Sequence, residues 1–327
     1  MIYFFMGKGR VKLLYRKIRI KLTAHYGKCR EKLACFRFFF LYLCKRKLLR
    51  FNSEIVADMK TGAKVLFISQ EIYPYLNENP YSILGRKLPQ VAQEAGCETR
   101  TFMPKFGEIN ERRNQLHEVI RLSGMNLIID DTDHPLIIKV ASIQAARIQV
   151  YFIDSDDYFR RRKGVCDEKG VEYEDNDERC IFFARGVLET VKKLRWTPDL
   201  IHCQGWMSAL APLYIKKVYN DDPFFKDAKV VFSLQDKDFK KPFSKNFAQK
   251  IMMDGISEED VKSIKTPKVD FVSLMKLATD HSDAIIKGNK DINTKLCNYV
   301  AAKDMPCLEF PGEDNYQAYI DFYNTLL

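Results

Sequence analysis

The chain has 327 residues, long enough for one large domain or two, and 46% of them are apolar, which is enough to bury a core and excludes a globally disordered chain. The formal net charge is +10, but residues 1–58 contain 15 Lys and Arg side chains against three acidic ones. The remaining residues hold the other 38 basic and 40 acidic side chains, so the body of the chain is nearly neutral and gives no support to a nucleic-acid-binding surface.

Residues 1–58 form a basic N-terminal extension with two interpretations. Their longest uncharged apolar run, residues 38–44, is far shorter than the roughly 20 residues that a transmembrane helix needs, and no signal-peptide pattern is evident. The extension could be a basic interfacial segment that binds anionic lipid or RNA. The interpretation that we favour is that it is not part of the working protein, since Met59 directly precedes the first clear strand and translation could begin there.

From residue 59 onward, strand and helix patterns alternate along the chain. The predicted strands are 65–68, 99–103, 200–202, 229–234 and 284–286. The predicted helices are 81–95, 177–194, 206–219, 269–279, 292–300 and 313–327, the last with an acidic first turn. Short β-rich runs at 117–154 predict a small antiparallel insertion. Alternation of this kind predicts an α/β fold with a Rossmann-like, doubly wound parallel sheet, whose ligands bind at the carboxyl ends of the strands.

The nine cysteines form no C-x-x-C pair, and no histidines stand at zinc-finger spacing. This pattern is typical of reduced thiols in a cytoplasmic protein. We therefore expect no metal site and no cofactor. A stripe of Phe239, Phe243, Phe247 and Ile251 is interrupted by Pro242, and it indicates either buried packing or a docking face.

Four stretches carry a family resemblance: "KVLFISQEIYPYL", "EDNDERCIFFARGVLETVKKLRWTPDLIHCQGWMSALAPLYIKK", "VVFSL" and "VSLMKLATDHSDAI". In this order and spacing, over residues 64–286, they resemble the N-terminal half of bacterial glycogen and plant starch synthases, glycosyltransferase family 5. The resemblance implies one half of a GT-B fold and glucosyl transfer from ADP-glucose to an α-1,4-glucan. In that family a second Rossmann-like domain supplies most donor contacts, and this chain ends about where that domain would begin. We therefore expect that a partner protein could supply it.

The family's phosphate loop is altered in this chain. The family reads Lys-Thr-Gly-Gly-Leu-Ala-Asp, and the aligned residues 77–83 read "NENPYSI". Asn77 replaces the cation, Glu78 adds a negative charge, and Asn79 and Pro80 replace the two glycines that let backbone N–H groups approach an anion. Pro80 also has no N–H to donate. The loop is therefore predicted to be the relic of a nucleotide site, which argues against ADP-glucose as a ligand, and Pro80 instead suits the start of a helix.

Other positions that the resemblance places at the site are changed as well. Gln204 stands where the family has the first His of His-Asp-Trp-His, Gln235 and Asp236 replace a His-Asn pair, and Ser273 replaces an Asn. A glutamine can hydrogen-bond a hydroxyl but cannot transfer a proton near neutral pH. No catalytic residue is therefore assigned.

Six residues stay as candidates for binding an α-glucan or maltooligosaccharide: Glu71, Asp175, Asn176, Gln204, Trp206 and Lys276. Three of them have a structural alternative. Asp175 and Asn176 could cap the helix that follows while Arg179 pairs with an acid. Trp206 could pack in the core, which we favour over stacking on a sugar.

Two classes of function follow. The chain could be a synthase-family enzyme that a separately encoded partner completes. Alternatively, it could be a pseudoenzyme that binds glucan or regulates a synthase. The lost basic and proton-transferring residues favour the second class.

Overall fold

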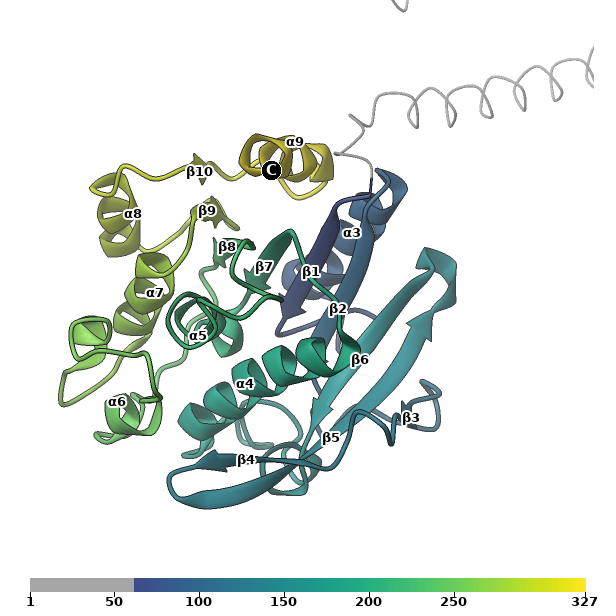
Figure 1. Cartoon of the computed structure of the whole chain (residues 1–327), viewed down its shortest axis with the longest axis horizontal. Helices are drawn as coiled ribbons and strands as arrows, with labels where there is room; N and C mark the ends of the chain where they lie inside the picture. The colour runs from purple at the N-terminus through teal and green to yellow at the C-terminus, as the bar shows by residue number, and fades with distance from the viewer. Residues whose placement is uncertain (1–61) are drawn as a thin grey trace, which may run out of the picture. The chain divides into compact units, whose positions relative to one another are not determined.

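The computed structural model describes residues 62–327, and the alternatives for the basic segment 1–58 lie outside the described residues. Within 62–327 a ten-stranded sheet has the order β10-β9-β8-β7-β1-β2-β6-β5-β3, with β4 paired to β5 (Figure 1). The strands that pair in parallel are β1 (Lys64–Ser69), β2 (Glu98–Pro104), β6 (Ile148–Asp154), β7 (Leu200–Gln204), β8 (Lys229–Leu234), β9 (Ala284–Lys287) and β10 (Cys307–Leu308). The predicted doubly wound parallel sheet is confirmed.

Helices connect these strands and cover the sheet. They are α3 (Pro80–Glu94), α4 (Asn176–Leu194), α5 (Ala211–Lys217), α6 (Phe247–Lys250), α7 (Phe271–Asp280), α8 (Thr294–Ala301) and α9 (Tyr316–Leu326). Helix α3 contacts α9, whereas α4, α5, α7 and α8 contact one another in succession. Among the helices of residues 62–327, none combines the length and the apolar character that crossing a bilayer requires.

The predicted antiparallel insertion is present but is joined to the main sheet. It comprises β3 (His117–Glu118), β4 (Met125–Ile129) and β5 (Thr132–Ile143). These strands pair with one another, or with β6, in the antiparallel sense, whereas β6 pairs in parallel with β2. The insertion therefore extends the Rossmann-like sheet at one edge.

Two predicted helices differ from the structure. The prediction of one helix over 206–219 is wrong, because a 3-10 turn (Trp206–Ser208) precedes the short helix α5. Pro212 lies in the first turn of α5, where its missing N–H costs nothing, so the helix starts there instead of continuing from Trp206. Helix α9 starts at Tyr316, so Glu313 and Asp314 precede it and do not form an acidic first turn.

A buried polar network joins α9 to the centre of the sheet. His202 in β7 has none of its surface exposed. Its Nδ1 lies 2.7 Å from the Tyr323 hydroxyl and 3.5 Å from Gln204 Nε2, and its Nε2 lies 2.6 Å from Ser233 Oγ. Because the Gln204 amide nitrogen can only donate, these contacts fit an imidazole whose Nδ1 accepts and whose Nε2–H donates to Ser233.

Tyr323→Phe should lower the free energy of unfolding by about 1–2 kcal/mol. The buried Nδ1 of His202 would then lose the hydroxyl group that donates to it at 2.7 Å. Tyr319→Phe is the matched control. Tyr319 is also in α9 and buried, but its ring centroid lies 6.5 Å from that of His202 and its hydroxyl makes no hydrogen bond to that ring. Urea denaturation of both variants measures the difference. Equal losses of stability would contradict the assigned hydrogen bond.

Candidate functional site

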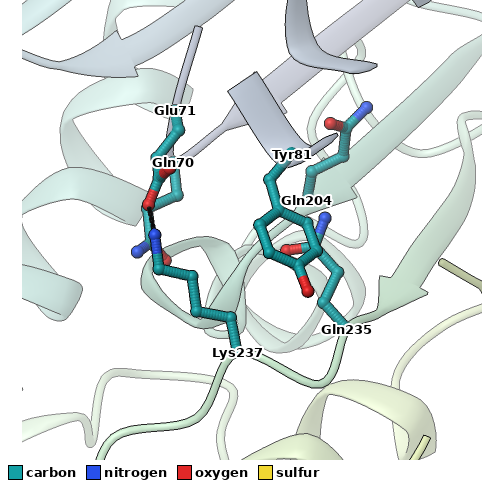
Figure 2. A pocket seen from close by; sticks show the side chains of 6 residues that line it. All are labelled: Gln70, Glu71, Tyr81, Gln204, Gln235 and Lys237. Carbon is teal, nitrogen blue, oxygen red and sulfur yellow. Dashed lines mark hydrogen bonds and ion pairs between the residues drawn. The ribbon is translucent and has the colours of Figure 1, made fainter. Parts of the chain in front are cut away.

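The candidate site is a small cavity at the carboxyl ends of β1, β7 and β8 (Figure 2). Strand β1 lies between β2 and β7, so the chain's winding direction reverses there, and α/β proteins bind ligands at such a point. The side chains that line the cavity are Gln70, Glu71, Tyr81, Gln204, Gln235 and Lys237.

A close approach of two strand ends shapes one wall of this cavity. The Gln70 N–H donates to the Gln204 carbonyl at 3.1 Å, and the Gln70 side-chain oxygen accepts from the Met207 N–H at 3.2 Å. Between Gln204 and Met207, Gly205 has a φ of 82°. A Cβ at Gly205 would lie 2.7 Å from the Cβ of Gln70, so glycine suits this position for both its backbone conformation and its lack of a side chain.

The start of α3 forms the neighbouring wall, and its backbone N–H groups already have partners. The Asn79 side-chain oxygen accepts from the Tyr81 and Ser82 N–H groups at 2.9 Å each. The Ser82 hydroxyl in turn accepts from the Asn79 N–H, which completes a capping box. Pro80 has no N–H, and the Ile83 N–H donates to the Asn79 carbonyl. The donors that an anion would use at a helix N-terminus are therefore occupied by the chain itself.

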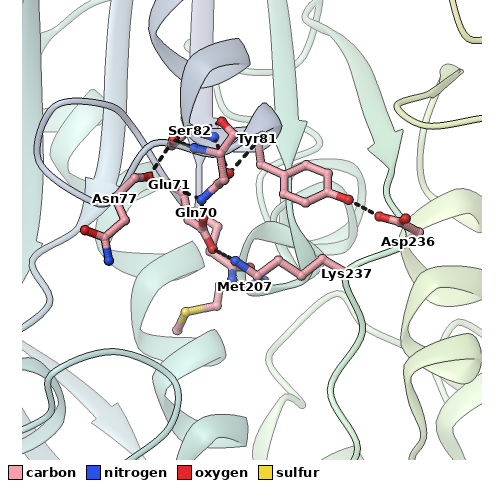
Figure 3. A network of polar contacts seen from close by, with 9 residues as sticks. Gln70, Glu71, Asn77, Tyr81, Ser82, Met207, Asp236 and Lys237 are labelled. Carbon is pink, nitrogen blue, oxygen red and sulfur yellow. Dashed lines mark hydrogen bonds and ion pairs between the residues drawn. The ribbon is translucent and has the colours of Figure 1, made fainter. Parts of the chain in front are cut away.

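Two contacts cross the mouth of the cavity (Figure 3). Lys237 forms an ion pair with Glu71, and the Tyr81 hydroxyl donates to the Asp236 carboxylate. Glu71 also accepts a hydrogen bond from the Asn79 side chain at 2.8 Å. The Lys237 Nζ lies 5.8 Å from the centre of the Tyr81 ring. The charge of Glu71 is therefore balanced by a lysine from the loop after β8.

The interior of the cavity is polar and small. Gln70, Gln204 and Gln235 are only 5%, 2% and 6% exposed. The cavity volume is about 10 Å³, which is room for about one water molecule. A sugar ring therefore cannot enter this site while the two contacts across the mouth are formed. Elsewhere in residues 62–327, no group of three or more His, Cys, Asp or Glu side chains is arranged to hold a metal ion.

The structure places Asp175 and Asn176 at the start of α4, outside the lining of this cavity. Asn176 donates to the Val165 carbonyl at 2.9 Å and accepts from Arg179 at 2.7 Å. The expectation that Asp175 caps the helix is wrong, because its carboxylate turns to Arg162 at 3.2 Å and makes no capping hydrogen bond.

Arg179 is fully buried, and its hydrogen bonds go to Asn176 and to the Gly164 carbonyl. The expectation that it pairs with an acid is therefore wrong as well. Instead, its guanidinium lies within 5.6 Å of the ring centres of Phe106, Phe159 and Tyr173. Burial lowers the pKa of Arg179 to about 10, so the side chain stays charged.

Trp206 and Lys276 also lie outside the cavity lining. The Trp206 indole is buried, with ring centroids 5.2 Å from Phe239 and 5.9 Å from Phe243. Trp206 therefore packs in the core, as the favoured interpretation predicted. The phenylalanine stripe is buried as well, which agrees with the packing alternative for it. The Lys276 Nζ lies 4.9 Å from the centre of the Tyr299 ring in α8. Of the six candidates, the cavity thus brings together only Glu71 and Gln204.

Four lining residues were not among the sequence candidates: Gln70, Tyr81, Gln235 and Lys237. The family resemblance had placed Gln235 at the site as a changed position, and Gln70 and Gln235 directly follow β1 and β8, so their place at strand ends was a further signal. Tyr81 lies in the first turn of α3, which also points to this edge. Lys237 gave no such signal, because it lies in a loop without regular structure.

Comparisons with known proteins agree with the fold. A family model described as the starch synthase catalytic domain matches residues 64–299. A glycogen synthase of Pelodictyon phaeoclathratiforme is 33% identical over 228 residues, covering 69% of this chain and 46% of the relative. A glycogen synthase of Chlorobium limicola is 34% identical over 223 residues, covering 68% and 45%. The chain thus spans about half the length of the curated relatives it matches.

Among solved structures, the catalytic domain of starch synthase IV from Arabidopsis thaliana, bound to ADP and acarbose, matches with a TM-score of 0.62. The match covers 76% of this chain and 51% of that chain, at 15% sequence identity. At that identity the likeness shows the fold alone, which matches about half of a GT-B glycosyltransferase catalytic domain.

Proposed function

Because the chain belongs to the glycogen and starch synthase family, we propose that it is a family member that binds α-glucan, or regulates a synthase, and transfers no glucose by itself. The observation that carries this proposal is the start of α3. There the Asn79 side chain takes the N–H groups of Tyr81 and Ser82, and Pro80 has none to offer.

The chemistry of transfer explains why this observation matters. Departure of a nucleoside diphosphate requires preorganised positive charge or N–H donors at the leaving group. The loop provides Asn77, Glu78, Asn79 and Pro80 instead. Lys237, the cation that lines the cavity, is already paired with Glu71. A diphosphate would therefore have to compete with a carboxylate of the chain for that lysine.

Glucan binding has weaker requirements. Hydroxyl groups need uncharged donors and acceptors, which Gln204 and its neighbouring glutamines provide, and Glu71 adds an acceptor. We expect the affinity to be low, because the cavity in its closed form has room for about one water molecule.

The test combines a transfer assay with binding measurements on the full chain. We expect no incorporation of labelled glucose from ADP-glucose into glycogen, no calorimetric binding of ADP, and weak binding of maltoheptaose. Gln204→Leu should weaken that binding further. Turnover by the purified chain would overturn the proposal, and no binding of maltoheptaose would overturn its glucan-binding form.

A matched variant tests the reason for the inactivity. Replacing three loop residues together, Asn77→Lys, Asn79→Gly and Pro80→Gly, returns the cation and frees the helix N–H groups. This triple variant should bind ADP measurably, while the native chain should not. ADP binding that is equally absent from both proteins would show that the loop is not the cause.

A further inference from the structure

The segment of residues 236–250 crosses from the end of β8 to α6 and is fastened to acidic residues along its length. We call it the lysine strap, after its lysines at positions 237, 240, 241, 245 and 250. Its acidic partners come from the loop after β1, from the turn between β4 and β5, from the residues before α4 and from α4 itself: Glu71, Asp130, Glu172, Glu174, Asp177 and Glu178.

Most of the strap is firmly anchored. The Glu172 carboxylate accepts the backbone N–H groups of Lys240 and Lys241, the latter at 2.6 Å. Beneath these contacts, Phe239 and Phe243 are buried and their rings stack with centroids 4.3 Å apart. Because buried aromatic rings hold residues 239–250 to the core, this part of the strap is expected to stay in place.

The end of the strap at the mouth of the cavity is held differently. Asp236 and Lys237 contact the opposite wall only through polar groups, Tyr81 and Glu71 (Figure 3). The Asp236 N–H also donates to the Asn289 side chain at 3.2 Å. The Lys237 side chain is 42% exposed, so solvent and salt screen its ion pair. These contacts are individually weak, and they can break without disturbing the aromatic anchor.

Two glutamine side chains that line the cavity next to this end of the strap have donors or acceptors that no residue of the described chain uses. Gln235 is 6% exposed as a residue, and its carboxamide makes no hydrogen bond with any other residue of the part of the chain that the structure describes. Gln70 uses its side-chain oxygen for Met207, which leaves its amide nitrogen for another acceptor. Both side chains line the cavity, and neither contributes an atom that is buried without a partner, so these groups are in reach of water or of a ligand in the cavity.

We propose that Asp236 and Lys237 form a gate over the cavity, and that the opened cavity takes an uncharged, hydroxyl-bearing ligand. This inference rests on the proposed glucan-binding function and adds to it how the site is closed and what it excludes. Opening removes the ammonium of Lys237 from Glu71. The exposed carboxylate then repels anions but accepts hydrogen bonds from hydroxyl groups, and the glutamine carboxamides carry no charge.

Two gate variants test the closure without any ligand. Lys237→Met removes the ion pair, whereas Tyr81→Phe removes the contact to Asp236 and retains both charges of the pair. Hydrogen exchange at the amides of residues 235–238 should become about three- to five-fold faster in each, as expected for the loss of one half-exposed contact. Lys262→Met is the control, because Lys262 pairs with Glu259 at the surface and contacts no residue that lines the cavity. Unchanged exchange in both gate variants would overturn the gate.

The same variants connect closure to binding. If ligand enters only the open state, the affinity for maltoheptaose should rise by the same factor as the exchange rate, because the apparent dissociation constant scales inversely with the open fraction. Gln235→Leu should reduce the binding in the Lys237→Met background.

Binding of maltoheptaose that none of these substitutions changes would refute the inference while leaving the proposed function intact. Faster exchange without any glucan binding would instead refute the proposed function and the ligand assigned to the opened cavity. The Tyr81→Phe variant keeps Lys237, so binding of ADP to this variant would refute the inference that the opened cavity takes an uncharged ligand.

Discussion

The free energy of unfolding should fall by roughly 3 kcal/mol through His202 alone as the pH is lowered from about 8 to about 4.5. Burial lowers the pKa of His202 to about 3, from 6.5 for an unperturbed histidine side chain. Between these two values the unfolded chain binds a proton at this residue and the folded chain does not. Stability is therefore complete above about pH 6.5 and is lost progressively as the pH falls toward the folded-state pKa.

The surroundings of His202 explain why the folded protein rejects the proton. Its ring nitrogens contact the Tyr323 hydroxyl, the Ser233 hydroxyl and the Gln204 amide. Within residues 62–327 no carboxylate forms an ion pair or hydrogen bond with this ring, so nothing compensates an imidazolium. Protonation would also turn Nδ1 into a donor that faces the amide nitrogen of Gln204, and this nitrogen can only donate.

Urea denaturation at a series of pH values measures the effect, and His202→Gln is the control. A glutamine side chain can accept from Tyr323 and donate to Ser233, but it does not titrate. Other groups contribute to the acid dependence of both proteins, so the difference between the two curves reports His202. A difference in slope of about one proton near pH 5 is expected. Parallel curves would show that His202 titrates normally.

Alternation of strand and helix patterns was sufficient to predict the parallel sheet, because its strands are buried on both faces and read as short apolar runs. In β1, for example, Val65, Leu66, Phe67 and Ile68 are all fully buried. The pairing of β6 with β2 could not be predicted in the same way. The mostly apolar run at 148–154 suits an antiparallel partner or a parallel one, and only long-range packing decides which strands it pairs with.

The candidate site was predicted less completely than the fold. Sequence position identified Glu71 and Gln204, since both lie at strand ends that a parallel sheet brings together. It could not identify Lys237, whose partner Glu71 is 166 residues away in the sequence. Likewise, Asp175 was a reasonable helix cap by residue type, but an arginine 13 residues earlier, Arg162, binds its carboxylate instead. Side-chain pairings of this kind depend on tertiary contacts that local pattern does not encode.

The position of Glu71 itself depends on a glycine, and Gly85→Ala should lower the free energy of unfolding by about 3 kcal/mol. Gly85 lies in α3, where alanine would ordinarily stabilise a helix by about 1 kcal/mol. Here a Cβ would lie 2.3 Å from the Glu71 backbone carbonyl oxygen and 3.3 Å from the Ile72 side chain. Backbone cannot rotate out of the way as a side chain can, so α3 must move away from the end of β1.

Gly186→Ala is the matched comparison, because Gly186 is also a buried helical glycine. In α4 a Cβ there would meet methyl groups of two side chains and no backbone atom, Ile153 Cγ2 at 2.9 Å and Leu136 Cδ1 at 3.1 Å. Those side chains can shift, and the gain in helix propensity offsets part of the cost, so the net loss should stay below about 1 kcal/mol. Thermal or urea denaturation of the two variants gives the comparison.

The Gly85 substitution should also act on the cavity. If α3 moves away from the carbonyl of Glu71, the carboxylate of Glu71 and the ring of Tyr81 are displaced from their partners in the lysine strap. Gly85→Ala should therefore accelerate hydrogen exchange at residues 235–238 even where the protein stays folded, and Gly186→Ala should not. Equal stability of the two variants, together with unchanged exchange, would mean that the close approach of α3 to β1 does not hold the gate closed.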